Sequence, residues 1–81
     1  MWTKSQLDKR VAELQRRINN NIYYIERADL ELWRLDNLTN EDTSEDQDKL
    51  LDFIERLQKQ NRYSKSRMNR AVASFNKQQQ G

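Results

Sequence analysis

The sequence contains no proline, no cysteine and no histidine, and its single glycine is the last of its 81 residues. Sheets need many turns, and turns favour glycine and proline, so this composition argues against a β-rich fold. Without cysteine and histidine there are no disulfides, thiolate metal ligands, cysteine nucleophiles or imidazole acid–base catalysts. We therefore expect no enzymatic activity, no metal, no cofactor and no small-molecule substrate.

The sequence also lacks long apolar runs. No stretch approaches the ~20 residues that a membrane-spanning helix needs, and the first residues contain no apolar signal segment. We expect a cytoplasmic protein that does not enter a membrane. Charged and apolar residues each make up 35% of the chain, a balance typical of long helices and coiled coils.

Two stripes of mainly apolar residues, spaced alternately by four and three, predict two long amphipathic helices. We expect the first over about 4–38 and the second over about 45–76, joined by an acidic turn at about 38–44 and followed by a frayed tail at 77–81. The stripes are Leu7, Val11, Leu14, Ile18, Asn21, Ile25, Ala28, Leu32 and Leu35, and then Leu50, Ile54, Leu57, Asn61, Ser64, Met68, Ala71 and Phe75.

A short connection between two such helices gives an antiparallel hairpin. The predicted fold class is therefore all-α, with residues 1–81 forming a single coiled-coil-type hairpin domain. A hairpin this polar has a small core of its own, so we expect it to dimerise into a four-helix bundle. Capping boxes at Thr3–Gln6 and Ser44–Gln47 mark the predicted start of each helix.

Each stripe is interrupted by polar residues near its middle. Pairing Leu35 with Leu51 fixes a register in which Asn21 lies level with Ser64, and Asn61 lies at nearly the same height. A buried polar layer of this kind sets the register of a coiled coil at some cost in stability. The alternative is a polar groove that receives the backbone of a partner, or a nucleotide.

Apolar side chains outside the stripe gather between residues 18 and 38. A cluster of this kind marks an interface, although it could instead cover the second helix and its loop. Trp and Tyr dominate binding hot spots, so the predicted partner-binding residues are Tyr23, Tyr24, Leu30 and Trp33. The predicted function is a protein–protein interaction module: a small adaptor, assembly factor or inhibitor of a kind that would suit a phage or other mobile element. The expected partners are another protein, a second copy of the chain, or both.

The alternative function is a small nucleic-acid-binding regulator of RNA or DNA. The chain has no acidic residue after Arg56, whereas acids concentrate at the turn. Rows of Arg and Lys can follow a phosphate backbone, and Tyr can stack on bases. The residues predicted for this role are Arg16, Arg17, Arg62, Tyr63, Arg67, Arg70 and Lys77. In a dimer, the same basic end could instead lie beside the acidic turn of the other copy.

Overall fold

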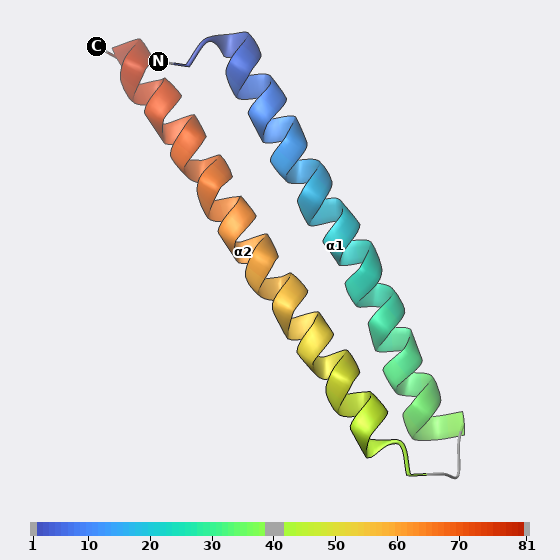
Figure 1. Ribbon diagram of the computed structural model, residues 1–81. Helices are drawn as coiled ribbons and strands as arrows, with labels where there is room; N and C mark the ends of the chain where they lie inside the picture. Colours follow the sequence, from blue (N-terminus) through green and yellow to red (C-terminus); the bar gives the residue numbers. More distant parts are fainter. Residues whose placement is uncertain (1, 39–41, 81) are drawn as a thin grey trace.

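The computed structural model describes residues 2–38 and 42–80, which form an elongated hairpin of two helices (Figure 1). Helix α1 spans Lys4–Leu38 and helix α2 spans Ser44–Gln80, and the described residues contain no strand. The helices run antiparallel, so both ends of the chain lie at one end of a body that measures 63 × 15 × 12 Å. The predicted all-helical hairpin is confirmed.

Helix α1 begins with the predicted capping box. The backbone N–H of Gln6 donates to the Thr3 hydroxyl oxygen at 3.1 Å, and the N–H of Thr3 donates to Oε1 of Gln6 at 3.0 Å. These two bonds satisfy backbone donors that have no partner within the first turn of a helix. The local sequence thus accounts for the start of α1.

The predicted cap of α2 was wrong by one residue. Thr43 caps the helix: its carbonyl accepts from the N–H of Gln47 at 2.9 Å, and its hydroxyl accepts from the Gln47 side chain at 2.8 Å. Ser44 is instead held by Asp42, whose Oδ1 accepts from the Ser44 N–H at 3.0 Å and from its hydroxyl at 2.6 Å. The middle of the predicted turn, 39–41, lies outside the described residues.

Helix α2 also ends later than predicted, at Gln80 instead of about residue 76. The reason is a contact with the other end of the chain. The Gln78 side chain donates to the carbonyl of Trp2 at 2.6 Å and accepts from the Trp2 N–H at 2.9 Å. The predicted frayed tail is therefore helical over 77–80, and its last turn is tied to the start of α1.

The core is the narrow seam between the two helices. All residues of both predicted stripes are buried or half-buried, so the predicted pattern is confirmed. Only a minority reach full burial, because two helices form one layer and leave each side of the seam open. The buried residues are Leu7, Leu14, Ala28, Ile54, Leu57, Ser64 and Ala71.

The polar layer forms, but with a different partner for Asn21. Its side-chain N–H donates to Oδ1 of Asn61 at 2.9 Å, and the Asn61 amide donates to the carbonyl of Ile18 at 3.4 Å. The predicted partner, Ser64, lies three residues further along α2. The observed register lets Asn21 donate to Asn61, whereas the predicted one would set the Asn61 amide against Ile25.

Candidate binding surfaces

The hairpin has two flanks, one on each side of the seam, and they differ in chemistry. On one flank, two adjoining hollows share Tyr63 and form a groove that runs along both helices. We call this surface the cationic groove. Its charged and aromatic lining residues are Trp2, Arg10, Arg17 and Tyr24 before the turn, and Arg56, Lys59, Tyr63, Arg67 and Arg70 on α2.

Seven-residue spacing builds the groove. Two helical turns take about 7.2 residues, so residues seven apart stay on one side of a helix. One such row lies on each helix, and the seam brings the two rows to the same flank. The rows are Arg10, Arg17 and Tyr24 on α1, and Arg56, Tyr63 and Arg70 on α2.

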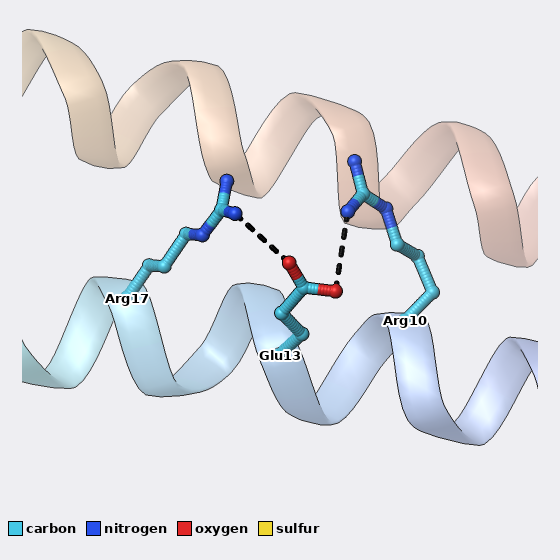
Figure 2. Close-up of polar contacts among 3 residues, drawn as sticks. All are labelled: Arg10, Glu13 and Arg17. Carbon is cyan, nitrogen blue, oxygen red and sulfur yellow. Dashed lines mark hydrogen bonds and ion pairs between the residues drawn. The ribbon is translucent and has the colours of Figure 1, made fainter.

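The groove carries a strong excess of positive charge. None of the described residues that line it is acidic, and the carboxylate beside it belongs to Glu13. Glu13 accepts from Arg17 at 2.8 Å and from Arg10 at 3.4 Å (Figure 2). These pairs are exposed to solvent, so each contributes less than about 1 kcal/mol. One carboxylate against six cations leaves the groove positive.

Two tyrosine rings lie among these cations and remain half-exposed. Tyr24 is 52% exposed and Tyr63 is 63% exposed. The guanidinium carbon of Arg67 lies 5.6 Å from the centroid of the Tyr63 ring, within the range of a cation–π contact. The Tyr24 ring lies in a T-shaped contact with the Tyr23 ring, with the ring centroids 5.4 Å apart and the planes at 73°. Each ring is supported by a neighbour and still presents free surface.

The opposite flank carries apolar side chains among charged ones, which include Lys4 and Asp8. Val11 and Val72 line one hollow there, across the seam from each other. Ile22 and Trp33 follow Val11 at intervals of 11 residues, which is about three turns and therefore the same side of α1. On α2, Leu51 lies 21 residues before Val72. This is three seven-residue steps, so the two residues lie on the same side of that helix. We call Val11, Ile22, Trp33, Leu51 and Val72 the apolar flank; all but Val11 are exposed.

The four residues predicted as partner anchors are exposed, but the structure does not bring them together. Tyr24 lines the cationic groove. Trp33 lies nine residues, or about two and a half turns, further on, and so lies on the apolar flank. Tyr23 and Leu30 each lie nine residues, or about two and a half turns, after a residue of the stripe. A half turn reverses the side of a helix, so both lie on the side of α1 that faces away from α2.

The residues predicted for nucleic-acid binding also divide between surfaces. Arg17, Tyr63, Arg67 and Arg70 line the cationic groove. Arg62 lines a third hollow on α2, which adjoins the groove at Arg70. Arg16 and Lys77 do not line the groove. Among the charged and aromatic residues of the groove, the nucleic-acid prediction did not include Trp2, Arg10, Tyr24, Arg56 and Lys59. The seven-residue rows were visible in the sequence and could have indicated most of them.

Neither helix, over the residues described, is long and apolar enough to cross a membrane. The same residues contain no group of three or more acidic side chains placed to hold a metal ion. Comparisons of the chain with models of known protein families, with curated proteins and with solved structures gave no match.

Proposed function

We propose that the chain is a non-enzymatic protein–protein interaction module of the adaptor, assembly-factor or inhibitor kind. We further propose that one of its partners is a second copy of the chain, bound through the apolar flank. The observation that carries this proposal is the set of exposed apolar side chains on the apolar flank. Trp33 is 58% exposed and Leu51 is 52% exposed. Burying apolar surface stabilises an association by about 25 cal/mol per Å².

The seam itself supports a partner on this flank. Ile18 and Ile25 of the α1 stripe are only half-buried within one hairpin. In four-helix bundles, a second pair of helices completes a core of this kind. A second hairpin on the apolar flank would cover Ile22 and Trp33 together with these stripe residues.

Charge favours an antiparallel arrangement of the two copies. Asp29 and Asp36 follow Ile22 in seven-residue steps, so they lie on the apolar side of α1 near the turn. Lys65 lies between Leu51 and Val72 on the matching row of α2. A twofold antiparallel dimer brings the acidic half of each copy over the basic half of the other, and this complementarity fixes orientation.

The experiment that tests this proposal is mass measurement by light scattering over about 1 µM to 1 mM, the range of moderate self-association. We expect a dimer for the parent chain. The double variant Ile22→Asp, Trp33→Asp should be monomeric with unchanged helix content in circular dichroism.

The matched control is Tyr23→Asp with Leu30→Asp. It removes one aromatic and one aliphatic residue and adds the same charge on the same helix, but on the side away from α2. This control should remain dimeric. A parent chain that stays monomeric throughout, or a control that dissociates as readily as the apolar-flank variant, would overturn the proposed dimer.

A further inference from the structure

The cationic groove lies opposite the apolar flank, so a dimer formed through that flank leaves one groove open on each copy. We propose that the cationic groove binds single-stranded nucleic acid, with its arginines and Lys59 on the phosphates and with Tyr24 and Tyr63 stacked on unpaired bases. This is a second activity on a second surface, and it does not depend on the proposed dimer.

The first step of the argument is charge. Arg10, Arg17, Arg56, Lys59, Arg67 and Arg70 all line the groove, and Glu13 is the acid beside it. Phosphate contacts by Arg and Lys release counterions from the nucleic acid, which supplies most of the affinity of sequence-independent binding. The groove therefore suits a ligand that carries a regular series of negative charges.

The second step is the placement of the tyrosines. Each ring shares its row with cations: Tyr24 ends the α1 row, seven residues after Arg17, and Tyr63 lies midway between Arg56 and Arg70. Exposed aromatic rings that alternate with cations bind bases by stacking, while the cations hold the backbone. Bases in a duplex are already stacked on each other, so this arrangement favours a single strand. An acidic peptide would use the cations but leave the rings without a planar partner.

The third step is size. From Arg56 to Ser74 the groove extends along 18 residues of α2, or about 27 Å at 1.5 Å per residue. That length accommodates several nucleotides, within the range of about 4–16 that single-strand-binding domains cover. The amides of Asn20 and Gln60 also line the groove. They can donate to or accept from base edges without selecting one base.

The test is fluorescence anisotropy with labelled oligouridine and oligothymidine of about 12 nucleotides. A duplex of the same length and a polyglutamate peptide serve as competing ligand classes. We expect both single strands to bind more tightly than the duplex or the peptide. With one phosphate contact for each of the six cations, log K should fall with log salt at a slope of about −4. Equal or tighter binding of the duplex or of polyglutamate would overturn the assignment to single strands.

Two matched pairs of substitutions locate the site. Arg56→Glu with Lys59→Glu should weaken binding more than about tenfold, because both residues line the groove. Arg62→Glu with Lys65→Glu makes the same change of charge at the same spacing on the same helix, but outside the groove. This control should weaken binding much less than the groove pair does, because neither Arg62 nor Lys65 lines the groove. Equal losses in both pairs would show that only overall charge matters. Light scattering on both variants separates a damaged groove from a changed dimer.

Three single substitutions test the roles inside the groove. Tyr63→Ala should weaken binding about tenfold, whereas Tyr63→Phe should retain it, because the ring stacks and the hydroxyl does not. Glu13→Gln should strengthen binding several-fold, since it removes the carboxylate that holds Arg10 and Arg17. Weaker binding after Glu13→Gln, or full binding after Tyr63→Ala, would contradict the proposed contacts.

Discussion

A single carboxylate organises the start of α2. Asp42 accepts from the hydroxyl and from the backbone N–H of Ser44, and these two hydrogen bonds lower the pKa of Asp42 below its ordinary value. The hydroxyl bond is the larger cause. Because Ser44 hydrogen-bonds to Asp42, Thr43 is the residue that caps the helix.

The charged form of Asp42 should stabilise the hairpin in a defined pH range. Its pKa is lower in the folded chain, so the stabilisation is present above the unfolded value of about 3.9 and is lost as the pH falls through the folded pKa. We expect the Asp42 carboxyl to titrate below 3.9 in an NMR experiment. Ser44→Ala should raise that midpoint, because it removes the larger cause. The same midpoint in the parent chain and in Ser44→Ala would contradict this account.

The two helix starts show how far local sequence determines a cap. At the start of α1, the capping box predicted between Thr3 and Gln6 forms. Thr43 and Ser44 are neighbours with the same chemistry, and both can act as caps. Their order is decided by Asp42, a third residue that the pattern of capping boxes does not include.

The pairing of the helices depends on the polar layer. Asn21 and Asn61 hydrogen-bond each other, and Asn61 also donates to the carbonyl of Ile18. In the part of the chain that the structure describes, no buried side-chain nitrogen or oxygen lacks a partner. Both hydrogen bonds of Asn61 cross the seam to α1, and a register shift would break them.

Replacing one member of the polar layer should cost more than replacing both. Asn21→Leu leaves the Asn61 amide facing an apolar group, and we expect the free energy of unfolding to fall by about 1–2 kcal/mol. The double variant Asn21→Leu, Asn61→Leu should be more stable than either single variant, at the expense of a unique register. Urea denaturation of the parent, both single variants and the double variant measures this coupling. Additive effects would show that the two amides act independently.

Periodicity predicted each helix but not the pairing between them. The stripes identify the buried side of α1 and of α2 because hydrophobic spacing is local information. The register depends on Asn21 meeting Asn61, and the end of α2 depends on Gln78 meeting Trp2, 76 residues apart in the chain. The cationic groove was predicted only in part for the same reason, since its lining residues lie on both helices.

The hairpin as a whole separates two kinds of surface. The predicted partner anchors were read as one patch because they are close in the sequence. A helix, however, turns Tyr24 and Trp33 to opposite flanks. The same rotation places cations on one flank and apolar residues on the other. Two copies joined through their apolar flanks would therefore carry their cationic grooves on the outside of the bundle, facing in opposite directions.

The orientation of the two copies can be measured because the chain contains no cysteine of its own. A spin label on Asp48→Cys lies on the exposed surface of α2 near the turn. In an antiparallel dimer of a 63 Å rod, the two labels lie near opposite ends, so pulsed electron paramagnetic resonance should give a separation of about 45 Å, set by the helical rise of 1.5 Å per residue. A parallel dimer would place them about 20 Å apart, two helix diameters. A distance of about 20 Å would show that Asp29 and Asp36 do not lie over the half of the other copy that contains Lys65. The charge argument for an antiparallel bundle would then be wrong, even if the chain is a dimer.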